Sequence, residues 1–343
     1  MASRPPSSNP RSSNPRSSRP RGSRPRGSRA RRALLAALVT ASVAVPVAGA
    51  ARPAAVPAPA PAVLAPLRAA TPAALDERYA ATRDDIRAAE RMAAGHGDRR
   101  RAAVLRAMAD PARHFLSFDG RDGGRTAEVF GDLSRAERIA VLVPGADTSL
   151  DRYERFRAGA VALQQELAGG AAVVAWLGYE TPGTVSLEAL TPGTADDAAP
   201  QLESFVSELS AASRPAARTS LLCHSYGSVV CARAASGLRV ADIVLYGSPG
   251  TGTGADDVAS LHTRASVWAG RGGNDWIADV PHMKLQLPFT TVGLGADPMS
   301  KGFGARIFDA GDGGHSDYLR RGSVSLANIA RIVNGQTPEA PRA

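Results

Sequence analysis

The regular alternation of short apolar runs with amphipathic stretches after residue 115 is the strongest constraint on how this chain folds. The runs at 138–145, 171–179 and 219–223 are apolar almost throughout, as expected of strands buried on both faces of a parallel sheet. Apolar side chains between the first two runs recur at helical spacing over 150–167. This alternation predicts an α/β fold, with a mostly parallel central sheet flanked by helices on both faces.

Shorter segments extend the same pattern to both ends of the sheet. Apolar runs predict five further strands, at 115–119, 126–130, 242–246, 265–270 and 305–308. Helical spacing predicts further helices near 202–209, 225–235 and 326–333. The Gly-, Thr- and Asp-rich segments at 183–200 and 251–264 are expected to be loops at the ends of the sheet, where functional sites usually lie.

Composition divides the chain into five parts. Residues 1–50 are Arg-rich, and residues 51–71 form an Ala/Pro-rich linker that is expected to be extended and semi-rigid. We expect helices within 72–112 to form an N-terminal extension that packs on the core. The α/β domain should span 113–336, followed by a disordered tail over 337–343.

The first fifty residues differ from the rest of the chain in charge. They carry ten arginines and no acidic residue, and subtracting these ten charges from the formal net charge of +9 leaves −1 for residues 51–343. A nucleic-acid-binding domain carries its basic surface on the folded part. The composition therefore gives no indication of a nucleic-acid partner for the folded domain.

An export signal is the interpretation that fits residues 1–50 best. Residues 7–31 repeat with a five-residue period and are almost without apolar side chains, which predicts disorder. Two arginines precede an apolar run over 33–47, and small residues at 48–50 suit cleavage before Ala51. We expect secretion by the twin-arginine or the general route, with transient membrane contact through the signal. An Arg-rich tail for nucleic acid or anionic lipid, and an uncleaved membrane anchor, are the alternatives.

Ser225 lies in the segment with the clearest chemical pattern. An apolar strand ends at Cys223, and His224-Ser225-Tyr226-Gly227 then leads into a helix. This is the strand–turn–helix context of G-x-S-x-G, with Cys223 in place of the first glycine. The strand turns back into a helix within one or two residues, so small residues are needed two positions before and after the serine. The pattern predicts that Ser225 is a nucleophile.

A serine hydroxyl needs a base, and in this architecture a carboxylate and then a histidine follow the serine, each just after a strand. Asp275 and His315 occupy such positions, both beside glycines. Asp297 and Asp312 are rival carboxylates, although Asp297 precedes a proline, which favours a simple turn. We therefore expect Ser225, Asp275 and His315 to form a catalytic triad.

Two backbone amides should stabilise the negative oxygen that such a reaction generates. Tyr226, directly after the serine, is expected to supply one. The loop after the strand at 138–144 is expected to supply the other, from Ala146 ahead of Gly145, because Pro144 has no N–H. The carboxylate of Asp147 would oppose a developing oxyanion, so we expect it to cap the next helix.

Four other residues complete the set of candidates. Cys223 and Cys231 form a disulfide in one hypothesis and remain two buried thiols in the other, since sequence does not give the distance between them. Tyr179 and Trp276 follow strands and either line a pocket or pack at its rim. No spacing of histidines and carboxylates suggests a metal, and we expect no cofactor.

Several of these segments together resemble a known family. VLVPGADTS, WLGYETP, LLCHSYGSVV, AGRGGND and GGHSDYL are similar to segments of secreted actinobacterial α/β-hydrolases that carry a domain of unassigned function. The likeness covers roughly 75–335. It implies the α/β-hydrolase fold, with Ser225, Asp275 and His315 as the triad, and it implies no particular substrate.

We expect a secreted, monomeric serine hydrolase that acts on small or medium acyl esters through an acyl-enzyme. One alternative is a cell-envelope acyltransferase that uses the same triad. The other is a non-catalytic, wall-associated binding module built on a hydrolase fold.

Overall fold

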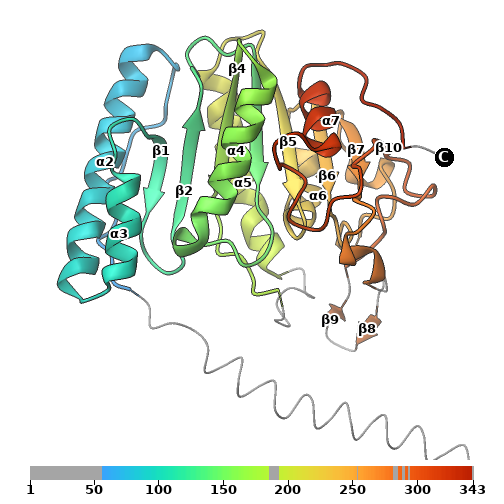
Figure 1. Cartoon of the computed structure of the whole chain (residues 1–343), viewed down its shortest axis with the longest axis horizontal. Coiled ribbons are helices and arrows are strands. Elements are labelled where there is room, and N and C mark those ends of the chain that lie inside the picture. The colour runs from blue at the N-terminus through green and yellow to red at the C-terminus, as the bar shows by residue number, and fades with distance from the viewer. Residues whose placement is uncertain are drawn as a thin grey trace, which may run out of the picture. The chain divides into compact units, whose positions relative to one another are not determined.

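Eight strands form one sheet in the part of the chain that the structure describes. This computed structural model describes residues 56–184, 193–252, 254–280 and 294–341, together with the backbone of 285–287 and 290–292. The strand order is β1-β2-β4-β3-β5-β6-β7-β10 (Figure 1). The strands are β1 (His114–Asp119), β2 (Arg125–Phe130), β3 (Arg138–Val143), β4 (Ala171–Leu177), β5 (Arg218–His224), β6 (Asp242–Tyr246), β7 (Ser266–Gly270) and β10 (Arg306–Ile307).

Parallel pairing dominates the sheet. β2 runs antiparallel to both of its neighbours, β1 and β4, whereas the pairs from β4 across to β10 are parallel. Every residue of β4 is buried, and β3 is buried from Ile139 to Val143. Such continuous apolar strands are typical of a parallel sheet covered on both faces. The predicted fold class is therefore confirmed.

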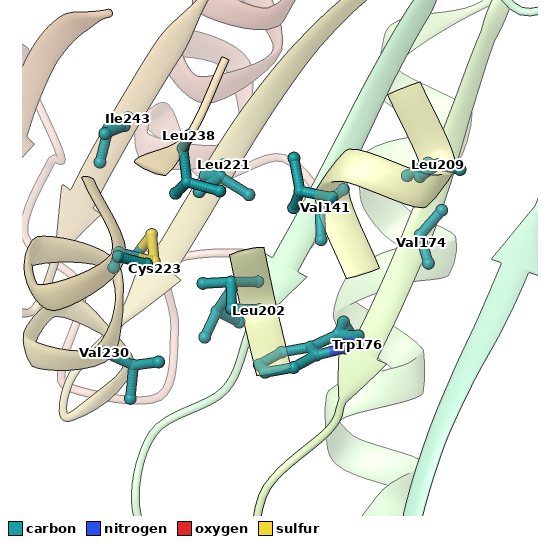
Figure 2. Packing of buried hydrophobic residues seen from close by; sticks show 14 of the residues in the cluster. Val141, Val174, Trp176, Leu202, Leu209, Leu221, Cys223, Val230, Leu238 and Ile243 are labelled. Carbon is teal, nitrogen blue, oxygen red and sulfur yellow. A yellow bond between two sulfur atoms is a disulfide. The ribbon is translucent and has the colours of Figure 1, made fainter. Parts of the chain in front are cut away.

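Helices cover both faces of the sheet (Figure 1). On one face lie α4 (Tyr153–Leu167) and α7 (Val324–Val333), and on the other lie α5 (Gly193–Ala212) and α6 (Gly227–Ala234). Because side chains alternate along a strand, Val141 packs in the cluster of Leu202 on α5, whereas Leu142 packs in that of Leu163 on α4. Figure 2 shows Val141, Leu202 and Trp176 in the first cluster.

Two N-terminal helices pack beside β1, namely α2 (Pro72–Gly95) and α3 (Arg99–Met108). Both have N-caps that satisfy a free backbone amide, since Thr71 accepts from the amide of Ala74 and Asp98 from that of Arg101. Ile86 of α2 and Leu105 of α3 are buried in one cluster with Phe115 of β1. The extension therefore shares its core with the sheet.

The described part of the Ala/Pro segment, from residue 56, lies against this domain. The amide of Leu67 donates to Oε1 of Glu208 at 2.7 Å, and the amide of Ala70 donates to the carbonyl of Ala212 at 2.8 Å. The two acceptors belong to α5. Residues 67–70 are thus held against the folded domain, although they were expected to belong to the extended linker over 51–71. The predicted export signal and its cleavage site lie outside the described residues.

Two segments that were expected to lack ordered structure differ from that expectation in their described parts. Helix α5 begins at Gly193, within the segment 183–200 that was expected to be a loop, because its alanines bury a face against the core and packing outweighs weak helix propensity. The tail over 337–343 was expected to be disordered. Instead, the amide of Glu339 donates to Asn328 at 2.9 Å, and its carbonyl accepts from the amide of Asp309 at 2.9 Å.

The remaining elements are short. A hairpin that the sequence did not predict pairs β8 (Leu285–Leu287) with β9 (Thr290–Val292). The described 3₁₀ helices are η1 (Leu150–Arg152), η3 (Ala235–Gly237), η4 (Ala259–Leu261) and η5 (Trp276–Asp279). Among the described helices, none is both long and apolar enough to span a membrane.

Candidate active site

Ser225 occupies a strained turn between β5 and α6. Its φ of 52° lies in the left-handed region, which non-glycine residues adopt at a cost and mostly at functional sites. Neighbouring backbone comes so close that a Cβ on Gly227 would stand 2.6 Å from the carbonyl oxygens of Val143 and Pro144. A Cβ on Gly145 would stand 2.6 Å from the Cβ of Ser225. The turn therefore requires glycine at both positions.

Cys223, which replaces the first glycine of the pattern, is joined to Cys231 in a disulfide (Figure 2). The bond links the end of β5 to the second turn of α6, with the two Cα atoms 6.4 Å apart. Both residues are fully buried in the cluster between the sheet and α6. Of the two hypotheses for the cysteines, the structure contains the disulfide, which braces the two elements that hold Ser225.

His315 joins Ser225 to Asp275. Its Nε2 lies 2.9 Å from Oγ of Ser225, and its Nδ1 lies 2.9 Å from Oδ1 and 3.1 Å from Oδ2 of Asp275. Ser225 follows β5, Asp275 follows β7 and His315 follows β10. These three parallel strands end at the same edge of the sheet, so residues 90 and 40 positions apart meet there.

The Asp275 carboxylate is 3% exposed and accepts several hydrogen bonds. Burial alone raises the pKa of this carboxyl, but the hydrogen bonds from His315, Tyr318 and the amide of Ile277 outweigh it, so the pKa lies below its ordinary value. The Ile277 amide donates to Oδ1 at 2.9 Å, at the start of η5. Asp275 is thus held in its charged form beside His315.

Tyr318 is a partner of Asp275 that the sequence reasoning missed. Its hydroxyl donates to Oδ2 of Asp275 and accepts from the amide of Gly272 at 3.0 Å. Burial, followed by the bond to Asp275, raises the pKa of the Tyr318 hydroxyl well above its ordinary value, so it remains a donor. The available signal was the tyrosine three residues after His315, in the GHS-x-Y segment.

His224, directly before the serine, is the last residue of β5. Its Nε2 donates to the backbone carbonyl of His315 at 2.8 Å. Burial, with a smaller effect from His315, lowers the pKa of His224 to about 4, so its ring is neutral at pH 7. The ring also packs against Tyr246 and Tyr318, with centroids 5.2 and 5.8 Å away. His224 therefore fixes the backbone that carries His315.

The two rival carboxylates lie elsewhere. Asp297 accepts from the Arg271 guanidinium, with Nη2 2.6 Å from Oδ1. Asp312 is exposed, and its backbone carbonyl accepts from the side chain of Asn274 at 2.7 Å. Of the three aspartates considered, Asp275 is the one whose carboxylate contacts His315.

The backbone of the loop after β3 lies against Ser225 through Gly145, and Ala146 follows directly. For Tyr179 the sequence left two alternatives, lining a pocket or packing at its rim. Its side chain is buried, and its hydroxyl donates to the carbonyl of Pro144 at 2.6 Å. Tyr179 therefore supports the loop that contains Ala146 instead of contacting a substrate.

Asp147 does not cap the next helix, which contradicts the second expectation for this loop. The 3₁₀ helix η1 has Ser149 at its N-cap, without a side-chain cap. The Asp147 carboxylate instead pairs with Arg152 at 3.2 Å and accepts from the amide of Thr184 at 3.1 Å. These partners compensate the negative charge that seemed unsuited to this loop.

Comparison with known proteins supports this fold. Residues 119–285 match the model of a family described as alpha/beta hydrolase, and this match covers β2 to β7 with Ser225 and Asp275. The chain has the α/β-hydrolase fold.

This α/β-hydrolase has curated relatives in mycobacteria. It is 31% identical over 255 residues to uncharacterized protein Rv2079 of Mycobacterium tuberculosis, an alignment that covers 64% of this chain and 38% of the relative. It is 32% identical over 178 residues to uncharacterized protein Mb0988c of Mycobacterium bovis, covering 46% of this chain and 66% of the relative. The chain thus spans little more than a third of the length of the first of these relatives.

Solved structures of the same fold class are also similar to this α/β-hydrolase. Esterase PE8 is 16% identical, with a TM-score of 0.42, over 62% of this chain and 98% of that structure. XC6422 from Xanthomonas campestris, described as an a/b serine hydrolase without lid, is 19% identical, with a TM-score of 0.40, over 66% and 93%.

Trp276, the second aromatic for which pocket lining and rim packing were the alternatives, lies at the surface of this α/β-hydrolase beside His315. The two rings have centroids 4.7 Å apart, and Trp276 is 47% exposed. An indole with half of its surface in water is an apolar platform next to the histidine. Trp276 therefore lies where a substrate's apolar part could contact it.

Proposed function

We propose that this α/β-hydrolase is a serine hydrolase that cleaves carboxylic esters through an acyl-enzyme formed on Ser225. One observation carries the proposal: Nε2 of His315 lies 2.9 Å from Oγ of Ser225 while Nδ1 lies 2.9 Å from Oδ1 of Asp275. A serine hydroxyl becomes an effective nucleophile when an oriented imidazole accepts its proton.

In the first half of the reaction, Oγ of Ser225 attacks the ester carbonyl carbon while its proton passes to Nε2 of His315. The carbonyl π electrons move onto oxygen, which gives a tetrahedral oxyanion. Collapse of this intermediate breaks the bond to the alkoxy oxygen. The imidazolium returns its proton to that oxygen, so that an alcohol leaves and Ser225 is acylated.

Asp275 orients His315 and stabilises its positive form. A carboxylate that accepts from Nδ1 fixes the tautomer in which Nε2 has a free lone pair. The hydrogen bonds from Tyr318 and Ile277, which lower the Asp275 pKa, keep that charge in place. His224 and Tyr318 are positioning residues in this scheme, because they act through His315 and Asp275.

The oxyanion would be stabilised by the backbone amides of Tyr226 and Ala146. Tyr226 follows the nucleophile at the start of α6, and Ala146 follows the glycine that touches Ser225. Amide donors fixed in advance at such a position lower the barrier by several kcal/mol in acyl transfer, on the order of 3 kcal/mol for each donor. The hydrogen bond from Tyr179 to Pro144 supports this arrangement by holding the loop.

In the second half, His315 removes a proton from water while the water oxygen attacks the acyl carbon. Collapse of the second tetrahedral intermediate breaks the bond to Oγ of Ser225, which takes the proton back from His315 as the acid leaves. We propose small or medium acyl groups as substrates. The exposed indole of Trp276 beside His315 supports an acyl chain with an apolar part. We further propose that the enzyme acts as a monomer, without a cofactor or nucleic acid.

The proposal is tested with p-nitrophenyl esters of two to twelve carbons and with a fluorophosphonate probe. We expect turnover by the wild type, with a preference among short and medium chains. Ser225→Ala should lose turnover and labelling, by a factor on the order of 10⁶ in kcat. Ser316→Ala is the matched control, because this exposed serine adjoins His315 and should retain both activities.

Two results would contradict the proposal. Labelling of Ser225→Ala at the wild-type rate would place the nucleophile elsewhere. A folded wild type that neither turns over esters nor reacts with the probe would leave a binding module as the better account.

We also propose that the chain is exported. The Arg-rich start and apolar run of residues 1–50 support this, and so does the Cys223–Cys231 disulfide, because disulfides persist mainly in oxidising compartments. Expression in an actinobacterial host, followed by N-terminal sequencing of protein from the medium, should give Ala51 as the first residue. Retention in the membrane with an intact N-terminus would indicate an anchor instead.

A further inference from the structure

A hollow of about 420 Å³ lies between α4 and the chain that follows His315. Residues of α4 and of 316–321 line it, and His224, Tyr246 and Tyr318 contribute from the sheet and the His315 loop. Ser225 is not among its lining residues. We call it the arginine cavity, after Arg155, Arg320 and Arg321, which are exposed along it. Its volume falls in the range of small-molecule sites.

The three arginines give this cavity an excess of positive charge. None of the three guanidinium groups has a carboxylate within 4 Å in the described parts of the chain. Other guanidinium groups do form ion pairs with carboxylates, for example those of Arg101, Arg113 and Arg271. Nη1 of Arg155 contacts the hydroxyl of Ser316 at 3.3 Å. Guanidinium groups bind carboxylates well, because their N–H groups match both oxygens. The charge therefore favours an anion.

Tyr246 adds a hydrogen-bond donor to this cavity. Its residue is 2% exposed, and its hydroxyl has no hydrogen-bond partner among the residues that the structure describes. Burial raises the pKa of this hydroxyl above its ordinary value, so it remains a donor. Because Tyr246 lines an open cavity, its hydroxyl can be hydrated there, and an oxygen atom of a ligand would replace that water.

Apolar groups form the rest of the wall. Phe156 and Ala162 of α4 line the cavity together with Leu319. Leu319 packs closely on α4, since a Cβ on Gly159 would stand 3.1 Å from Cδ1 of Leu319. A bare inorganic anion would leave these apolar side chains in contact with water, whereas a ligand with a hydrocarbon part would cover them.

We propose that the arginine cavity is a binding site for a small organic carboxylate with an apolar body, distinct from the Ser225 site. The guanidinium groups of Arg155, Arg320 and Arg321 hold the carboxylate, and the side chains of Phe156 and Leu319 cover the hydrocarbon part. The Tyr246 hydroxyl donates to an oxygen carried on that part. The site adjoins His224 and Tyr318, which position the triad, but the proposal does not depend on ester hydrolysis.

The test measures binding to the full chain carrying Ser225→Ala, so that no substrate is turned over. Calorimetric titration compares hexanoate with hexanamide, which lacks the charge, and with inorganic phosphate, which lacks the hydrocarbon. We expect hexanoate to bind at least about tenfold more tightly than either. A second probe, 5-oxohexanoate, adds a ketone oxygen and should bind several-fold more tightly than hexanoate, because a hydrogen bond contributes about 1 kcal/mol.

Variants locate the site. Arg155→Gln/Arg321→Gln should weaken hexanoate binding by about tenfold or more, since charged hydrogen bonds contribute at least about 1.5 kcal/mol. Arg135→Gln is the matched control, an exposed arginine paired with Asp132 in another loop, and should bind as before. Tyr246→Phe should bind hexanoate normally and lose the gain from the ketone.

Three results would overturn the proposal. Hexanamide or phosphate could bind as tightly as hexanoate, or the double arginine variant could bind like the control. Alternatively, the wild type with fluorophosphonate bound at Ser225 could lose hexanoate binding, which would place the ligand at the nucleophile. If Tyr246→Phe keeps the full gain from 5-oxohexanoate, the role of Tyr246 is excluded as well.

Discussion

The two sides of the loop that carries His315 differ in how fully their polar groups are paired. On the side of Ser225, the imidazole, the Asp275 carboxylate and the Tyr318 hydroxyl each have partners at hydrogen-bonding distance. On the side of the arginine cavity, no described residue hydrogen-bonds to the Tyr246 hydroxyl, and no described carboxylate lies within 4 Å of the three guanidinium groups. Yet Ser225 and the cavity both adjoin the end of β5 and share His224.

This difference separates two kinds of site. A catalytic group works best when its geometry is fixed before the substrate arrives, so its partners come from the protein. A binding site leaves donors unsatisfied, and the ligand completes them. Substitutions on the Ser225 side should therefore affect catalysis and stability more than substitutions in the arginine cavity.

The largest effect is expected where the pairing is tightest. Asp275→Asn should lower kcat by about 10⁴-fold with little change in structure, because an amide no longer holds the His315 tautomer that accepts the serine proton. Ester turnover measures it. Asp312→Asn, at the exposed rival carboxylate, is the control and should stay within about twofold of the wild type. Equal losses in the two variants would mean that Asp275 does not orient His315.

His224, which both sides share, should make stability depend on pH. A histidine titrates near 6.5 when unfolded, and the pKa of His224 in the fold is about 4. Between these values the unfolded chain binds more protons, so stability falls as the pH falls from 6.5 towards 4. The full loss is about 3 kcal/mol, at about 1.4 kcal/mol for each pKa unit.

Urea unfolding at pH 7 and pH 4 measures this loss. His224→Gln can still donate to the His315 carbonyl but does not titrate, so it should lose about 3 kcal/mol less than the wild type. His96→Gln replaces an exposed histidine and should follow the wild type. Identical pH profiles for the wild type and His224→Gln would show that His224 is protonated as easily in the fold as in the unfolded chain.

The disulfide braces the Ser225 side alone. Cys223→Ala/Cys231→Ala should lower the free energy of unfolding by about 2.5 kcal/mol, the loop-closure entropy expected for a separation of eight residues. Denaturant titration under oxidising conditions measures this. If reduced and oxidised wild type unfold at the same denaturant concentration, the bond contributes nothing to the turn.

Tyr318 and Tyr246 give the smallest and most direct comparison. Their ring centroids lie 5.3 Å apart, but within the described residues only the Tyr318 hydroxyl is hydrogen-bonded. Tyr318→Phe removes a hydrogen bond to a carboxylate and should cost about 2 kcal/mol of stability, with a shift of the acidic limb of the pH–kcat profile to higher pH. Tyr246→Phe removes a hydroxyl without a partner and should cost almost nothing. Equal costs would show that the Tyr246 hydroxyl is already paired.

Much of the fold and of the Ser225 site could be predicted because the signals are local. The apolar run at 138–145 requires burial on both faces, and the Ser225 turn requires small neighbours, whatever the rest of the chain does. The order of Ser225, Asp275 and His315 follows from parallel strands that end at one edge. The turn at Ser225 and the contacts of Asp275 and His315 agree with that expectation.

Contacts between distant residues could not be predicted in the same way. His224 meets the His315 carbonyl across 91 positions, and Tyr179 meets Pro144 across 35. The sequence indicated no partner for His224 and left Tyr179 either lining a pocket or packing at its rim, because residue type alone does not say which backbone carbonyl lies nearby. Helix α5 was missed at Gly193 for a similar reason, since burial of its alanines stabilises a segment with weak propensity.

By itself, the sequence determined the layered α/β architecture, the strained serine turn and the succession of acid and base, since periodicity and backbone sterics act over a few residues. Tertiary structure alone decided which carboxylate reaches His315, that Cys223 and Cys231 are bonded, and that Tyr318 has two hydrogen-bond partners while Tyr246 has none among the described residues. These outcomes depend on distances of a few ångströms between side chains from different strands, and only the packed fold sets such distances.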